Sequence, residues 1–279
     1  MRTSFLLAAT AASALLMAQA VQASPIVDTS GYSLTTLSAN DDGYAGPVGL
    51  GFTANFFGVD QTQAYVNNNG NITFGAGQST YTPYGLTTAL PGGITGIIAP
   101  FFADVDTRGA GSGLVSYGTG TYGGHSSFVV NYPNVGYYYA ATDKLDNFQL
   151  LLVSRSDIAA GDFDIYFNYG SMQWDTGDAS NGVDGLCGTD GHSAAVGYSN
   201  GSGNAGTNYE LPGSHVCGAF VDGGPNQLVA STNDGVTGQY LFQVRNGNVA
   251  PPPTGVPEPA TIALFAAGLV GLGVVRRRL

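Results

Sequence analysis

The stretch AYVNNNGNITF at residues 64–74 decides the fold class of this chain. Aromatic and β-branched residues on both sides favour strands, and Asn-Gly between them is a strong hairpin signal because both residues tolerate positive φ. We therefore predict a β-hairpin with one strand ending at 65–66, a turn within 67–71 and a second strand at 72–74.

Short apolar or alternating runs of the same kind recur along the middle of the chain, separated by Gly, Asn, Asp and Pro. They predict strands at 48–57, 96–102, 126–132, 145–153, 163–169, 194–198 and 239–244. The run Asn-Phe-Gln-Leu-Leu-Leu-Val at 147–153 fits a buried strand better than a helix. Many short strands with turns at near-regular spacing predict one large antiparallel all-β domain over 24–247, either a β-sandwich or a barrel-like fold.

The composition supports this class and excludes several others. Glycine accounts for 43 of 279 residues, only 10% of the residues are charged, and the formal net charge is −11. Good helix formers for exposed faces are scarce, which excludes an all-helical bundle. The negative charge argues against a nucleic-acid partner, because a polyanion requires a basic face.

Residues 1–23 have the layout of a secretory signal peptide: Arg2, an apolar run at 5–17 and small residues at 21–23. The apolar run is too short to span a bilayer comfortably. A buried N-terminal helix is the alternative. We expect an N-terminal signal helix and export of the chain.

The C-terminal segment combines a proline-rich motif, an apolar run and a basic cluster. The residues are Pro257, Glu258 and Pro259, then 260–275, then Arg276, Arg277 and Arg278. The apolar run predicts a hydrophobic helix of roughly 24 Å, slightly short of a bilayer core. The arginines are expected to stay in the cytoplasm by the positive-inside rule, so the preceding domain faces outward. Residues 248–256 form a Pro-rich spacer.

Residues 257–279 closely resemble the PEP-CTERM sorting signal of Gram-negative bacteria. The resemblance implies an exosortase-type membrane enzyme as the processing partner. It also implies transient anchoring in the inner membrane through the transmembrane helix, followed by delivery to the outer envelope, the cell surface or the extracellular matrix. A plain tail anchor without processing is the alternative.

Several blocks together resemble the nidogen-like extracellular (NIDO) domain. They are 64–74, 97–106, 147–150, 167–174 and 195–214, in the order of that family. Phe102 stands where the family pattern expects tryptophan, which keeps an aromatic residue. The resemblance implies an extracellular module linked to cell–matrix adhesion, without a catalytic set, whose partners are matrix polysaccharide or surface proteins.

Two cysteines, Cys187 and Cys217, fit an oxidising compartment, where a pair usually forms a disulfide. A reactive thiol is the alternative, although neither cysteine has Cys-x-x-Cys or metal-ligand spacing. We predict a structural disulfide.

Asp104 and Asp106 follow a buried strand two residues apart, so both carboxylates are expected on one face. Such a pair with neighbouring oxygens would suit Ca²⁺. The alternative is that they cap loop amides or pair with Arg108. The segments 41–43 and 175–190 are further acidic candidates, or simply solvated turns.

Clustered tyrosines offer a candidate binding surface at Tyr132 and Tyr138, since tyrosine gives amphipathic contact area at low entropy cost. Simple strand alternation is the alternative, with Tyr138 pointing outward and Tyr137 and Tyr139 inward.

The pattern Gly-Tyr-Ser-Asn-Gly at 197–201 matches a nucleophile elbow, with Glu210 and His215 following in α/β-hydrolase order. The motif requires a strand-to-helix turn, and no helix is expected after Gly201. His125 and His192 add no zinc-ligand spacing. We therefore predict a non-catalytic adhesion protein of the biofilm matrix. A carbohydrate-binding lectin, or a polysaccharide hydrolase using Asp104 with a distant carboxylate, is the alternative.

Overall fold

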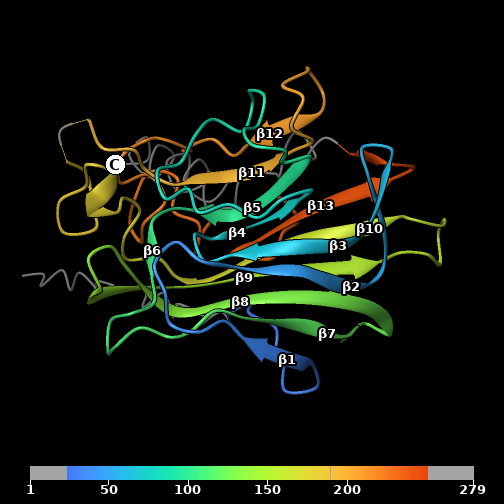
Figure 1. The fold of residues 1–279 in the computed structure, drawn as a ribbon, viewed down its shortest axis with the longest axis horizontal. Helices are drawn as coiled ribbons and strands as arrows, with labels where there is room; N and C mark the ends of the chain where they lie inside the picture. The colour runs from blue at the N-terminus through green and yellow to red at the C-terminus, as the bar shows by residue number, and fades with distance from the viewer. Residues whose placement is uncertain (1–23, 189, 251–279) are drawn as a thin grey trace, which may run out of the picture.

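Two antiparallel sheets stack face to face in the computed structural model, which describes residues 24–188 and 190–250 (Figure 1). The larger sheet has the strand order β1-β7-β8-β9-β10-β13-β14, and the short strand β6 pairs with β8. Its strands are β1 (Ser33–Thr36), β6 (Val105–Asp106), β7 (Ser116–Tyr122), β8 (His125–Tyr137), β9 (Ala141–Ser154), β10 (Phe163–Ser171), β13 (Gln239–Arg245) and β14 (Asn248–Val249).

The smaller sheet has the order β12-β11-β5-β4-β3-β2. Its strands are β2 (Tyr44–Phe56), β3 (Val59–Asn67), β4 (Asn71–Phe74), β5 (Gly96–Phe102), β11 (Ala195–Ser199) and β12 (Asn208–Glu210). In Figure 1 this sheet lies above β8, β7 and β1. The all-β prediction is confirmed, and the two open sheets make the fold a sandwich and not a barrel.

The helices expected at the two ends lie outside the described residues. Between residues 24 and 250, the described part contains one short 3₁₀ turn, η1 (Asp178–Ser180), as its helical element. No helix in that part of the chain is long and apolar enough to cross a membrane.

The predicted hairpin is formed by β3 and β4. Asn67 pairs with Asn71, and residues 68–70 make the turn, with Gly70 at φ +75°. Asn67 donates from Nδ2 to Asn71 Oδ1 at 2.7 Å, so side chains reinforce the backbone pairing. The hydroxyl of Tyr132, on the opposite sheet, donates to the carbonyl oxygen of Asn67 at 2.8 Å. The turn is therefore held at a fixed place between the two sheets.

The C-terminal half of β9, residues 148–154, is buried on both faces, as its apolar run predicts. Leu150 and Leu152 point into the core between the sheets, whereas Leu151 lies on the outer face of the larger sheet. The N-terminal segment covers that outer face, because the Gln149 side chain both accepts from the Val27 amide at 3.1 Å and donates to its carbonyl at 3.0 Å. This cover explains why the run lacks polar alternation.

Candidate functional site

Three loops meet at the end of the sandwich where β5 passes into β6. They are residues 40–43 before β2, the turn 68–70 between β3 and β4, and residues 103–104 between β5 and β6. Asn68 joins the three loops: its Nδ2 donates to the carbonyl oxygens of Asp41 and Val105, both at 2.5 Å. The asparagine of the turn therefore fixes the position of the acidic loop.

Three carboxylates converge in this place. Asp41, Asp42 and Asp104 each have a side-chain oxygen within 4.8 Å of those of the other two. Asp104 is only 1% exposed, and neither of its carboxylate oxygens has a hydrogen-bond partner among the described residues. Asn69 lies beside them, with its Nδ2 donating to Asp42 Oδ1 at 2.9 Å and its own Oδ1 unpartnered in the described part.

Negative charge accumulates around Asp104. Burial raises the pKa of Asp104 to about 8, and the charges of Asp41, Asp42, Asp106 and Asp178 add to the effect. Burial also raises the pKa of Asp41 to about 6, together with the charges of Asp106 and Asp42 and against the opposing effect of Arg108. The cluster therefore favours a bound proton or a bound cation.

The sequence pairs Asp106 with Asp104 as expected calcium ligands, but in the structure Arg108 and the Ala140 amide bind the Asp106 carboxylate. Its Oδ1 accepts from the Arg108 backbone amide and Nε, both at 2.9 Å. Its Oδ2 accepts from Arg108 Nη2 at 2.6 Å and from the Ala140 amide at 2.7 Å. Burial raises the pKa of Asp106, but these hydrogen bonds outweigh it and hold the pKa below its usual value. Asp106 therefore caps a loop amide and pairs with Arg108, which is the alternative expected from the sequence.

Arg108 connects this ion pair to the acidic cluster. Its Nη2 also lies 2.8 Å from Asp41 Oδ2, while Asp41 Oδ1 has no partner among the described residues. Because Arg108 is half exposed, its ion pair with Asp41 contributes little to the stability of the fold. Arg108 binds mainly Asp106, and its single contact with Asp41 orients that carboxylate.

Each of the two interpretations of the tyrosines is wrong at one residue: the binding surface at Tyr132 and the strand alternation at Tyr139. Tyr132 is fully buried and stacks on Phe148 with ring centroids 4.4 Å apart, so it offers no binding surface. Tyr139 is 78% exposed, whereas strand alternation predicts it inward. The reason is that β8 ends at Tyr137, and residues 138–140 form a turn. Tyr138 is partly exposed in that turn and remains a candidate contact residue.

The Ser-Glu-His pattern does not form a nucleophile elbow. Ser199 is fully buried at the end of β11 and its Oγ accepts from the Gly201 amide at 3.1 Å. The residues after it lead to β12 without a helix, so the strained turn that exposes a nucleophile is missing here. Glu210 and His215 do meet, with Oε1 and Nε2 3.1 Å apart, and Glu210 also accepts from the Leu86 amide.

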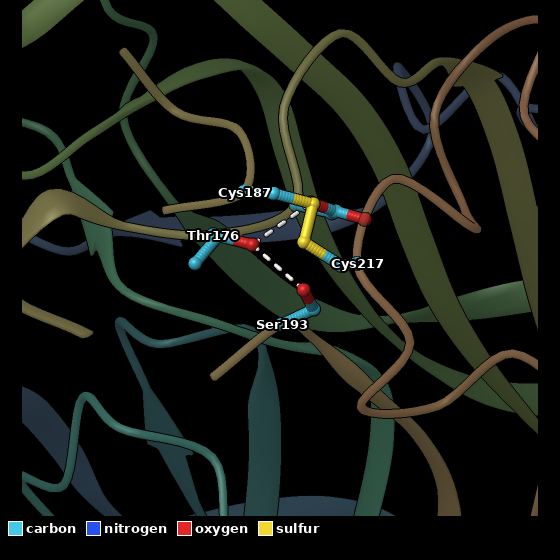
Figure 2. The surroundings of a disulfide bond; sticks show 5 residues. Thr176, Cys187, Ser193 and Cys217 are labelled. Atoms are coloured by element: carbon cyan, nitrogen blue, oxygen red, sulfur yellow. Dashed lines mark hydrogen bonds between the residues drawn. A yellow bond between two sulfur atoms is a disulfide. The ribbon is translucent and has the colours of Figure 1, made fainter. Parts of the chain in front are cut away.

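The disulfide between Cys187 and Cys217 is present, with Cα atoms 5.3 Å apart (Figure 2). Thr176 and Ser193 lie beside it, and their hydroxyl oxygens are 2.8 Å apart. The bond joins the loop after β10 to the loop after β12, two irregular segments that lie outside the strands of both sheets. Closing this loop, with a sequence separation of 30, is worth roughly 3–4 kcal/mol of unfolding free energy.

Sequence reasoning missed the contribution of Asn69 and underrated Asp41 and Asp42. Asn69 is part of the Asn-Gly turn signal, so no further role was assigned to its side chain from the sequence. The acidic pair is 62 residues from Asp104 in the chain, and only the sheet order brings the two loops together. The run of three consecutive asparagines at 67–69 was the available signal.

Comparison with known proteins gives two family matches. A family model described as NIDO related matches residues 18–213, and one described as a PEP-CTERM protein-sorting motif matches residues 255–278. Alpha-tectorin from Mus musculus is 30% identical over 233 residues, and the proteins from Homo sapiens and Gallus gallus are 29% and 28% identical. These alignments cover 76% of this chain and 10% of each relative. No solved structure matches the chain.

Proposed function

The chain belongs to the NIDO-related family, and on that premise we propose that its β-sandwich is a non-catalytic adhesion module of the bacterial cell surface or biofilm matrix. The chain is an exported, surface-associated protein, because the same sequence carries a PEP-CTERM sorting motif. The proposed partners are matrix exopolysaccharide or surface proteins. The proposed route is processing by an exosortase-type enzyme in the inner membrane of a Gram-negative cell.

The observation that carries the proposal is the order of the two matches. The NIDO-related region is followed, after a Pro-rich spacer, by the sorting motif at residues 255–278. Proline-rich sequences favour stiff, extended chains, so the spacer is expected to separate the sandwich from the sorting motif. In the proposed route, processing at the motif then releases the sandwich from the inner membrane.

The described residues support binding better than catalysis. Ser199 is inaccessible, and Asp104, the acid proposed for a hydrolase, is 1% exposed. A polysaccharide therefore cannot reach either group without rearrangement of the fold. Neither matched family model is described as an enzyme. A lectin is the remaining alternative, and saturable binding of one defined sugar would favour it.

Replacing Pro257, Glu258 and Pro259 together by alanine is expected to stop processing, because the sorting enzyme loses its recognition motif. Mass spectrometry of the protein from the native host should then find the C-terminal segment intact and the chain in the membrane fraction. Cells carrying this variant should lose most of their adhesion to their own matrix.

The matched control replaces Pro251, Pro252 and Pro253 by alanine, which removes three prolines and leaves the motif untouched. Its processing should equal that of the wild type. Unchanged processing and unchanged adhesion in the motif variant would contradict the proposed route.

A further inference from the structure

We propose that the carboxylates of Asp41, Asp42 and Asp104 bind one calcium ion at the end of the sandwich. The side-chain oxygen of Asn69 supplies a fourth protein ligand. The ion would tie the loop before β2 to the β3–β4 turn and to the link between β5 and β6. This binding site goes beyond the proposed adhesion function and is tested independently of it.

The first argument is the isolation of the Asp104 carboxylate. The side chain is 1% exposed, and both oxygens are unpartnered among the described residues. A buried polar group without a partner is costly, and a buried charge is normally paired or coordinated to a metal. Gly177 closes the site from one side, since a Cβ at that position would come within 2.5 Å of Asp104 Oδ2. A cation is the partner that this carboxylate lacks.

The second argument is independent and comes from Asn69. This residue is 2% exposed, and its Nδ2 is held by Asp42 Oδ1 at 2.9 Å and by the Thr80 carbonyl at 3.2 Å. These two bonds fix the amide beside Asp42 and leave its Oδ1 without a partner among the described residues. A neutral amide oxygen and carboxylates together are the ligand types that a hard cation prefers.

The spacing of the oxygens suits calcium. Calcium binds oxygen ligands at about 2.3–2.6 Å, so two oxygens bound to the same ion lie no more than about 5 Å apart. The three carboxylates satisfy this limit, with oxygens within 4.8 Å of one another. The ligands come from three irregular loops, which suits the flexible geometry of calcium better than the strict octahedron of magnesium. Water supplies the remaining ligands.

Arg108 does not take the place of the ion. It binds one oxygen of Asp41 and both oxygens of Asp106, and no hydrogen bond or ion pair joins it to Asp104 in the described part of the chain. The second oxygen of Asp41 has no hydrogen-bond partner among the described residues. Arg108 therefore binds one ligand residue of the proposed site and does not neutralise Asp104.

The test is calorimetric titration of calcium chloride into the full-length chain after chelation. We expect one site with Kd between about 10⁻⁴ and 10⁻³ M, the range of extracellular calcium modules. Calcium at one hundred times Kd should raise the Tm by about 5 °C. Magnesium chloride should bind at least tenfold more weakly. A chain that shows neither calcium heat nor a Tm shift, or that prefers magnesium, would overturn the proposal.

Asp104→Asn keeps the shape of the side chain and removes its charge. This variant should weaken calcium binding at least tenfold while its metal-free form melts no lower than the wild type. Asp42→Asn, in a partly exposed loop, gives a second test that does not depend on a buried position. Asp60→Asn is the matched control, because Asp60 is exposed at the start of β3 and contacts Asn55. Wild-type affinity in both Asp104→Asn and Asp42→Asn would refute the site, whereas it is expected in Asp60→Asn. None of these outcomes decides the adhesion proposal.

Discussion

Replacing Gly70 by alanine is expected to prevent folding. Gly70 has φ +75°, and a Cβ at this position would overlap the backbone carbonyl oxygen of Phe101. Neither group can move independently, since the Phe101 amide donates to the Gly70 carbonyl at 3.2 Å. The change combines a left-handed conformation with a backbone clash. We expect a loss of about 5 kcal/mol, comparable with the whole stability of an ordinary domain.

Gly58→Ala is the control for this prediction. Gly58 also has positive φ, at +84°, but no heavy atom lies within 4 Å of the position of its Cβ. The expected cost is only about 1–2 kcal/mol, from backbone conformation alone. Circular dichroism of the purified variants measures both effects. A folded Gly70→Ala protein that melts like Gly58→Ala would show that the turn is not packed on β5 in this way.

Replacing Trp174 by alanine is expected to cost about 3–5 kcal/mol of unfolding free energy. The indole is fully buried and packs edge-on against Phe101, with ring centroids 5.6 Å apart. Its Nε1 donates to the Val135 carbonyl at 3.1 Å, so the variant also loses a buried hydrogen bond. Trp174 thus joins the segment after β10 to both sheets.

Urea unfolding followed by far-ultraviolet circular dichroism measures this loss, because Trp174 is the one tryptophan of the chain and its fluorescence disappears with it. Trp174→Phe keeps most of the apolar volume and should lose less than Trp174→Ala. Tyr139→Ala, at a 78% exposed aromatic residue, should stay near the wild type. Equal losses for Trp174→Ala and Tyr139→Ala would contradict the described core.

Local sequence signals predicted the hairpin and most of the long strands. The 96–102 prediction coincides with β5, and the turn signal lies at the junction of β3 and β4, because both depend on neighbouring residues. β7 was not predicted, since its sequence SYGTGTY contains two glycines and lacks an apolar run. Gly118 is required there by packing: a Cβ would collide with the backbone of Ser33 on β1. Such a requirement arises only when distant strands pair.

The candidate site was predicted only in part for the same reason. The sequence places Asp104 and Asp106 two residues apart, but local hydrogen bonds assign Asp106 to Arg108. The carboxylates that lie near Asp104 come instead from the loop that contains Asp41 and Asp42. Tyr132 was misread because burial depends on the opposite sheet, where its hydroxyl finds the Asn67 carbonyl. The alternation of residues along one strand does not predict which residues meet across the two sheets.

The most direct test of the adhesion account is retention of the mature protein on matrix polysaccharide from its own host. Protein recovered from the native culture is titrated against immobilised polymer, with a globular protein of similar net charge as the baseline. The account predicts saturable retention above the baseline and an unchanged polymer length by size-exclusion chromatography. Retention no greater than the baseline, or shortening of the polymer, would contradict it.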